Sequence, residues 1–152
     1  IPRSVLVLAS SSFGGLIAGL ALKKYLLPKI KKCIFVSPLW GMDPHDAAHT
    51  RIVDETSALM ASAYPISYRF KNKKKFFNEI KGVTKLSDVG QSFKDGKKHL
   101  LVFCGRNDKV TPAHMAIQLA RENKNTKLYV LGGGHSSQIE WERFAAIIQR
   151  VL

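Results

Sequence analysis

Four short apolar runs most constrain the fold of this chain. They are SVLVLA at 4–9, CIFVS at 33–37, LLVFC at 100–104 and KLYVL at 127–131. Continuous runs rich in Val, Ile, Leu and Phe are typical of strands that are covered on both faces of a parallel sheet. Helical patterns follow three of the runs, at 13–26, 112–123 and 138–152. This alternation predicts an α/β fold with a mostly parallel sheet of about four strands and flanking helices.

A long segment, residues 41–97, separates the second apolar run from the third. It is too long for a loop without secondary structure, so we expect helices within it, around 46–62 and 73–81. The chain has 152 residues, of which 45% are hydrophobic, and this suits a single domain with a real core. We therefore predict one domain, with its core in 1–40 and 98–152 and a helical insertion at 41–97.

Three consecutive serines follow the first apolar run, within the stretch LASSSFGGLIAG. A nucleophile on a tight strand-to-helix turn needs small residues two positions before and two positions after it, because strand and helix pass close together there. Ser12 has Ser10 and Gly14 at these positions. Choosing either of the other serines would place Leu8 or Phe13 there and crowd the turn. The spacing therefore selects Ser12.

The stretch around Ser12 resembles the nucleophile elbow of the α/β-hydrolase family, G-x-S-x-G, with Ser10 in place of the first glycine. After the run 100–104 comes GRNDKVTP, which resembles the acid turn of the family and contains Asp108. After the last run comes GGGHSS, which contains His135. Nucleophile, acid and histidine follow one another in this order in the family, and all three residues would lie at the carboxyl edge of the sheet.

The resemblance implies a serine hydrolase that cleaves a carboxylic ester or a related acyl substrate and needs no metal or cofactor. Ser12 would be the nucleophile, His135 its general base and Asp108 the acid that orients the histidine. The backbone N–H of Phe13 would supply one oxyanion donor. The insertion at 41–97 stands where the family has its lid. Some apolar side chains in and beside this insertion are expected to line an acyl pocket; the candidates are Trp40, Met60, Tyr64, Phe70, Phe76 and Phe77.

The resemblance runs from the elbow strand to the last helix and so covers the C-terminal half of a hydrolase. The family has about four further strands before the elbow, together with a loop that supplies the second oxyanion donor. We therefore expect that this sequence belongs to a longer polypeptide, or that another chain, such as a second copy of itself, pairs with the strand at 4–9.

Two other functions stay open. The chain could be an inactive α/β-hydrolase-like interaction subunit, or a basic protein that binds nucleic acid or an anionic membrane surface. It carries 24 Lys and Arg against 11 Asp and Glu, a net charge of +13, and its densest basic run is YRFKNKKKFF at 68–77. No nucleic-acid-binding motif accompanies this run, so a solvated helix face is the favoured interpretation and an anionic surface the next.

The two cysteines, Cys33 and Cys104, lie within apolar runs, and their spacing suits neither a metal site nor a disulfide framework. We predict buried free thiols, which favours a reducing, cytoplasmic compartment. No stretch approaches the roughly 18 uncharged apolar residues that a membrane span needs.

Overall fold

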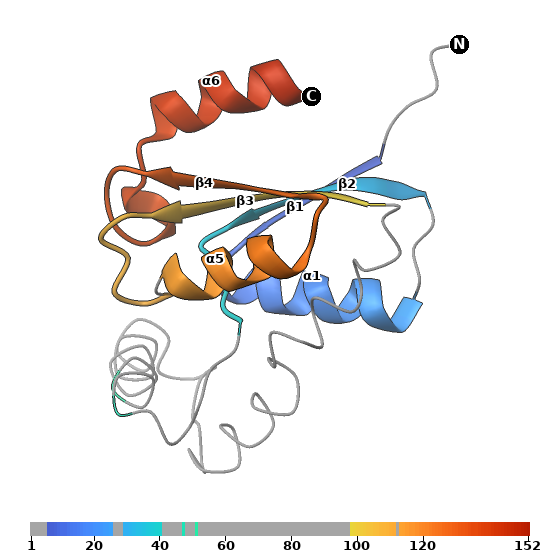
Figure 1. Cartoon of the computed structure of the whole chain (residues 1–152), viewed down its shortest axis with the longest axis horizontal. Coiled ribbons are helices and arrows are strands. Elements are labelled where there is room, and N and C mark those ends of the chain that lie inside the picture. The colour runs from blue at the N-terminus through green and yellow to red at the C-terminus, as the bar shows by residue number, and fades with distance from the viewer. Residues whose placement is uncertain (1–5, 26–28, 41–46, 48–50, 52–97, 112) are drawn as a thin grey trace, which may run out of the picture.

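The computed structural model describes residues 6–25, 29–40, 47, 51, 98–111 and 113–152. The four strands among these residues form one parallel sheet in the order β1-β2-β3-β4 (Figure 1). This confirms the predicted α/β class, the parallel sheet and the flanking helices. Along the chain the described elements are β1 (Leu6–Ser11), α1 (Ser12–Tyr25), β2 (Ile30–Val36), β3 (His99–Gly105), α5 (Ala113–Glu122), β4 (Thr126–Leu131), the 3-10 helix η1 (Ser136–Gln138) and α6 (Trp141–Val151).

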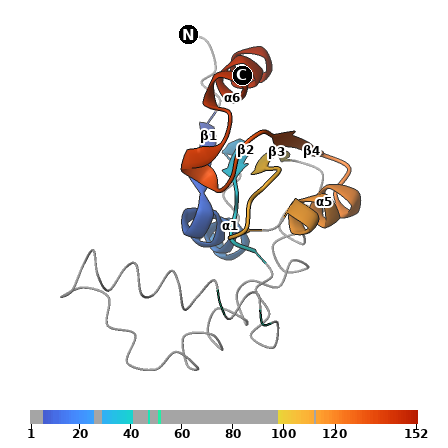
Figure 2. The same ribbon diagram turned by 90° about the vertical axis from the view of Figure 1, so that its left-hand side faces the viewer.

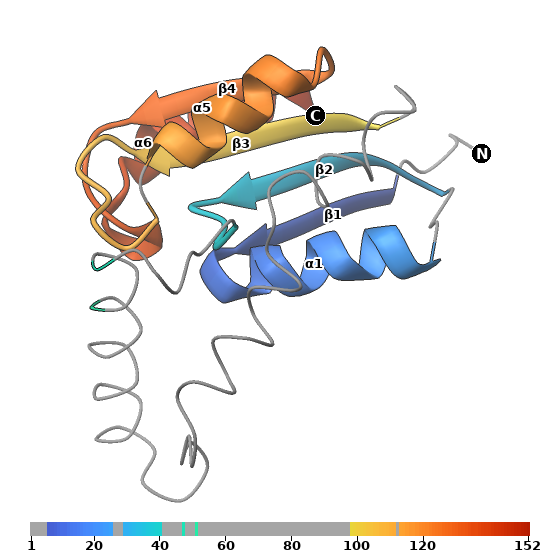
Figure 3. The same ribbon diagram turned by 60° about the horizontal axis from the view of Figure 1, so that its bottom comes forward.

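Helices cover both faces of the sheet. α1 and α5 lie on one face, α1 beside β1 and α5 beside β4, whereas α6 lies on the other face (Figures 2 and 3). Because successive residues of a strand point to opposite faces, each strand feeds two cores. In β2, Cys33 and Phe35 join the core under α1 and α5, and Ile34 and Val36 join the core under α6. Burial on both faces explains why the central strands are apolar without alternation.

Trp40 closes the first core. Its side chain is buried, its ring stands edge-on to Phe35 with 4.8 Å between centroids, and its indole N–H donates to the carbonyl oxygen of Gly15 at 3.2 Å. The chain beyond β2 is thereby fastened to α1. Trp40 is a core residue, and the other candidates for an acyl pocket wall lie outside the described residues.

Aromatic packing holds α6 on the second core. Phe103 of β3 stacks on Tyr129 of β4 with 4.9 Å between ring centroids, and Phe144 of α6 meets Phe103 edge-on at 4.7 Å. Edge-on and offset ring pairs add to the free energy of burial because ring edges and faces carry opposite partial charges. These contacts hold β3, β4 and α6 together in the second core.

The last helix starts later than predicted. The pattern at 138–152 placed Ile139 on the apolar stripe of this helix, but α6 begins at Trp141. Ile139 is extended, with φ −73° and ψ 161°, and forms an isolated antiparallel bridge with Gly133. It still reaches the second core, where it is 5% exposed. Ile139 is therefore apolar because its loop packs on the core, although its position also fits the apolar spacing of a helix.

The first strand also differs from its predicted bounds. It was expected at 4–9, but residues 4 and 5 lie outside the described part of the chain, and β1 continues to Ser11. Parallel pairing with β2 extends to the pair Ser11 and Val36. Two of the three serines are therefore strand residues, and only Ser12 lies at the turn.

Both cysteines are buried and unpaired, as predicted. Burial raises the pKa of Cys33 and of Cys104 to about 11, so both are neutral thiols at neutral pH. Within the insertion the structure describes only Ala47 and Arg51, so the helices predicted at 46–62 and 73–81 and the basic run at 68–77 lie outside the described residues. Among the described helices, none is long and apolar enough to cross a membrane.

Candidate active site

Ser12 stands at the junction of β1 and α1. Its φ is +47°, a left-handed backbone conformation that a serine adopts only in a sharp, strained turn. A Cβ atom placed on Gly14 would lie 3.8 Å from the Cβ of Ser10, so these two positions face one another across the turn. A Cβ on Gly14 would thus make an ordinary van der Waals contact with Ser10.

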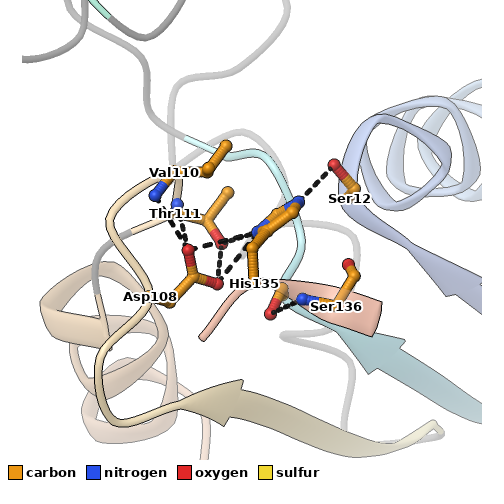
Figure 4. A network of polar contacts seen from close by, with 7 residues as sticks. Ser12, Asp108, Val110, Thr111, His135 and Ser136 are labelled. Atoms are coloured by element: carbon orange, nitrogen blue, oxygen red, sulfur yellow. Dashed lines mark hydrogen bonds and ion pairs between the residues drawn. The ribbon is translucent and has the colours of Figure 1, made fainter. Parts of the chain in front are cut away.

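Asp108 lies in the turn after β3, and its own turn fixes its carboxylate (Figure 4). Oδ1 accepts the backbone N–H groups of Val110 at 2.9 Å and of Thr111 at 2.8 Å. Oδ2 accepts the hydroxyl of Thr111 at 2.8 Å. An Asp that accepts N–H groups two and three residues further on is a common turn device. Here it leaves the carboxylate buried, with no exposed side-chain surface.

Two glycines permit the close packing of the loop that carries His135, one against β3 and one within the loop. A Cβ atom on Gly105, the last residue of β3, would lie 1.9 Å from the carbonyl oxygen of Gly134. Gly133 has φ +89°, and a Cβ there would lie 1.8 Å from the carbonyl oxygen of Gln138. Only residues without a side chain fit these two positions. Within the GGG sequence before the histidine, Gly133 is therefore a steric requirement of the loop.

The imidazole of His135 joins the other two side chains (Figure 4). Its Nδ1 lies 3.0 Å from Oδ2 and 3.1 Å from Oδ1 of Asp108, and its Nε2 lies 2.8 Å from Oγ of Ser12. A carboxylate only accepts hydrogen bonds, so Nδ1 carries the proton. Nε2 then presents its lone pair to the Ser12 hydroxyl, which donates to it.

The charge of Asp108 is stabilised by this hydrogen bonding. Burial alone raises the pKa of its carboxyl, but the hydrogen bonds from His135, from the backbone and hydroxyl of Thr111, and from Ser37 outweigh burial and lower the pKa to about 2. Hydrogen bonds to the charged form favour that form. Asp108 is therefore an anion at any pH at which the chain would work.

Strained backbone gathers around these three side chains. Among the described residues, positive φ values occur at Ser12, Ser37, Gly133 and Ser136. Ser37 follows β2 with φ +44°, is fully buried, and its Oγ accepts the backbone N–H of Ser136 at 3.2 Å. Non-glycine residues in this region cost about 1–3 kcal/mol each and cluster at functional sites.

The structure thus brings Ser12, Asp108 and His135 together at the carboxyl edge of the sheet. Phe13, the predicted oxyanion donor, follows Ser12 in the first turn of α1, where backbone N–H groups have no partner within the helix. The remaining described histidines stand apart: His99 begins β3 and His114 lies in α5, and both are exposed.

Two residues of the site were missed in the sequence analysis, Thr111 and Ser37. Thr111 had a readable signal, because it stands three positions after an Asp in a turn. Ser37 had only its place directly after a buried strand, at the same sheet edge as Ser12.

A cavity of about 420 Å³ lies at the opposite, amino edge of the sheet. Its lining comes from the starts of β2, β3 and β4 and the end of α6, and includes Lys32, His99, Lys124 and Lys127. Ser12 lies at the other end of the strands. A molecule bound in this cavity would therefore not reach the Ser12 hydroxyl. No cluster of three or more His, Cys, Asp or Glu side chains placed to hold a metal ion occurs in the part of the chain that the structure describes.

The sequence matches no protein-family model and no curated protein. The fold, in contrast, is similar to solved structures. The esterase Pf2001 of Pyrococcus furiosus aligns with 95% of this chain at a TM-score of 0.64 and 19% identity. MGS-MChE2, an α/β-hydrolase from a metagenome of lagoon sediments, aligns with 95% of this chain at a TM-score of 0.63 and 20% identity. The 2-hydroxy-6-oxo-6-phenylhexa-2,4-dienoate hydrolase of Rhodococcus sp. strain RHA1 aligns with 93% of this chain at a TM-score of 0.63 and 14% identity.

The chain spans only part of these proteins. It covers 52% of the esterase, 59% of the metagenomic hydrolase and 62% of the Rhodococcus hydrolase. Each of the three solved structures therefore contains a large part that has no counterpart in this sequence.

Proposed function

We propose that this chain, which has the fold of the α/β-hydrolases, is a serine hydrolase that cleaves a carboxylic ester or related acyl substrate through Ser12. The hydrogen-bonded series from Ser12 Oγ to His135 Nε2, at 2.8 Å, and from His135 Nδ1 to Asp108, at 3.0 Å, carries this proposal. A serine hydroxyl is a weak nucleophile unless a base takes its proton, and the series supplies that base together with the group that orients it.

In the acylation step, Ser12 Oγ attacks the carbonyl carbon of the substrate while His135 Nε2 takes the hydroxyl proton. The carbonyl oxygen becomes an oxyanion and is stabilised by the backbone N–H of Phe13. The imidazolium then gives its proton to the leaving alcohol, and an acyl group stays on Ser12. Asp108 remains an anion throughout and stabilises the positive charge on the ring.

In the deacylation step, water attacks the acyl carbon and His135 accepts one of its protons. Collapse of the second tetrahedral intermediate returns this proton to Ser12 Oγ and releases the carboxylic acid. The enzyme ends with the same protons as at the start, so no cofactor or redox partner enters the balance.

The proposal also covers the parts that surround the site. A second oxyanion donor is expected from a segment outside this sequence, either in the same polypeptide or in a partner chain that pairs with β1. We expect residues 41–97 to act as a lid and to select the acyl chain. Exchanging this segment for a short linker should then change chain-length preference more than attack on acetate esters.

Labelling with a fluorophosphonate tests the proposal directly. An activated serine displaces fluoride from this probe and becomes covalently phosphonylated, and peptide mass spectrometry identifies which serine reacts. We expect modification at Ser12, abolished in Ser12→Ala and in His135→Ala.

Ser10→Ala is the matched control. Ser10 Oγ is buried and makes no hydrogen bond to any described residue, so its removal leaves the relay intact. This variant should label at nearly the wild-type rate. Equal losses in Ser10→Ala and Ser12→Ala would contradict the assignment of the nucleophile. A folded chain in which the probe leaves Ser12 unmodified would favour the alternative, an inactive interaction subunit with the same fold.

A further inference from the structure

Thr111 contacts both partners of the predicted acid–histidine pair. Its backbone N–H donates to Asp108 Oδ1 at 2.8 Å, and its hydroxyl donates to Oδ2 at 2.8 Å. The same hydroxyl oxygen lies 3.3 Å from Nδ1 of His135. One residue thus holds each oxygen of the carboxylate separately and also touches the ring that the carboxylate orients.

The direction of these hydrogen bonds is fixed by chemistry. Nδ1 of His135 carries a proton because it faces a carboxylate, so it cannot accept the proton of the Thr111 hydroxyl. This proton must go to Asp108 Oδ2, and a lone pair of the hydroxyl oxygen is left facing Nδ1–H. The hydroxyl therefore supports one tautomer of His135, the one that leaves Nε2 free to accept from Ser12.

The contacts also fix the rotation of the carboxylate. Nδ1 lies almost equally far from the two oxygens, at 3.0 and 3.1 Å, so the ring is centred on the carboxylate. Oδ1 accepts two N–H groups, from Val110 and Thr111, and Oδ2 accepts the Thr111 hydroxyl. A hydrogen bond from Ser37 also stabilises the charged carboxylate. The Thr111 hydroxyl is thus the contact that fixes Oδ2 beside Nδ1, and its loss would weaken the alignment of the carboxylate with the ring.

We propose that Thr111 is a positioning residue of the site, whose hydroxyl holds the Asp108 carboxylate in the orientation that aligns His135 with Ser12. This inference rests on the proposed hydrolase function. Thr111 touches no reacting atom and acts only through the two side chains that it contacts. Its own burial, at 5% exposure, keeps water from replacing the hydroxyl.

Two substitutions separate the hydroxyl of Thr111 from its shape. Thr111→Val keeps the volume and the backbone donor but removes the hydroxyl, and Thr111→Ser keeps the hydroxyl and loses a methyl group. Each variant is measured in two ways: the rate of fluorophosphonate labelling at Ser12, and the pH midpoint of the Asp108 carboxyl carbon in a ¹³C NMR titration, assigned by its loss in Asp108→Asn.

In Thr111→Val we expect labelling to slow by about tenfold or more and the titration midpoint to rise by about one pH unit, the usual worth of a hydrogen bond to a charged group. Thr111→Ser should keep both values near those of the wild type. If Thr111 had only a structural role, its substitutions would change stability, but the titration midpoint of Asp108 would not rise in Thr111→Val while staying unchanged in Thr111→Ser. If Thr111→Val matches the wild type in both measurements, the inference is wrong.

The two measurements also keep this inference apart from the proposed function. The titration of Asp108 does not depend on any reaction at Ser12. If the wild type is not labelled, the hydrolase proposal fails, and the titration still decides whether Thr111 controls Asp108. If the wild type is labelled and the midpoint of Thr111→Val stays unchanged, the positioning role alone fails.

Discussion

At the scale of single residues, the proposed division of labour between Asp108 and His135 can be tested by one atom exchange. Asp108→Asn keeps the shape of the side chain but can donate to Nδ1, which favours the other imidazole tautomer and presents Nε2–H to Ser12. We expect esterase activity, or labelling of Ser12, to fall by about three to four orders of magnitude, to the level of His135→Ala. If most activity remained in Asp108→Asn, the acid would have to come from elsewhere in the chain.

The same carboxylate should make stability depend on pH in a defined window. The pKa of Asp108 is about 2 in the folded chain, below its ordinary value of 3.8. A carboxyl whose pKa is lowered by folding stabilises the fold fully at a pH above its pKa in the unfolded chain. This contribution is lost as the pH falls through the pKa of the folded chain. Between pH 5 and 2 the wild type should therefore lose about 2 kcal/mol more than Asp108→Asn, measured by urea unfolding. Parallel losses in the two proteins would show that Asp108 is not stabilised as an anion.

The sequence was sufficient to predict which side chains meet, but not what holds them. Ser12, Asp108 and His135 could be found because each follows a strand and strand ends share an edge. Thr111 could have been singled out from its place three residues after an Asp in a turn, because its hydrogen bond to Asp108 lies within that turn. Ser37 could not, because its contact with Ser136 joins residues 99 positions apart, which no local pattern reports.

At the scale of elements, periodicity predicted the strands and helices but not how they end. Each apolar run lies within or overlaps an observed strand, because burial on both faces demands such runs. Ile139 fits the apolar stripe of a helix by spacing, yet it belongs to the loop that returns to the core before α6 begins. The start of α6 is set by the packing of this loop against the core, and the spacing of apolar residues in the sequence does not reveal that packing.

The approach of β3 to the histidine loop gives an element-scale prediction. In Gly105→Ala the new methyl group would collide with the backbone of Gly134, which has no flexible end that could move aside. We expect the free energy of unfolding to fall by about 2 kcal/mol or more and labelling of Ser12 to slow, because His135 must shift. Denaturant unfolding and probe kinetics measure the two effects.

Gly14→Ala is the control for this prediction. It adds the same methyl group at a glycine of the same edge, but the group would meet Ser10 Cβ at an ordinary contact distance of 3.8 Å. Because alanine also favours the helix, stability should stay unchanged or rise by up to about 1 kcal/mol. Similar destabilisation in the two variants would mean that the close approach at Gly105 is not the cause.

At the scale of the whole molecule, the described part of the sheet ends at β1. Among the described strands, β1 pairs only with β2, and Leu6 on β1 is 53% exposed. The similar solved structures are considerably longer than this chain, which spans 52–62% of the three compared above.

An unpaired apolar edge is a template for pairing with another strand. We therefore predict that the 152-residue chain on its own self-associates through β1 or is poorly soluble. The net charge of +13 opposes association, so added salt should strengthen it by screening. Leu6→Lys places a charge on the edge and should give a monomer, whereas Tyr25→Lys adds the same charge at a 60% exposed position at the end of α1 and should still associate. Sedimentation velocity over a range of concentration and salt measures this. A wild-type chain that stays a monodisperse monomer throughout would show that β1 needs no partner.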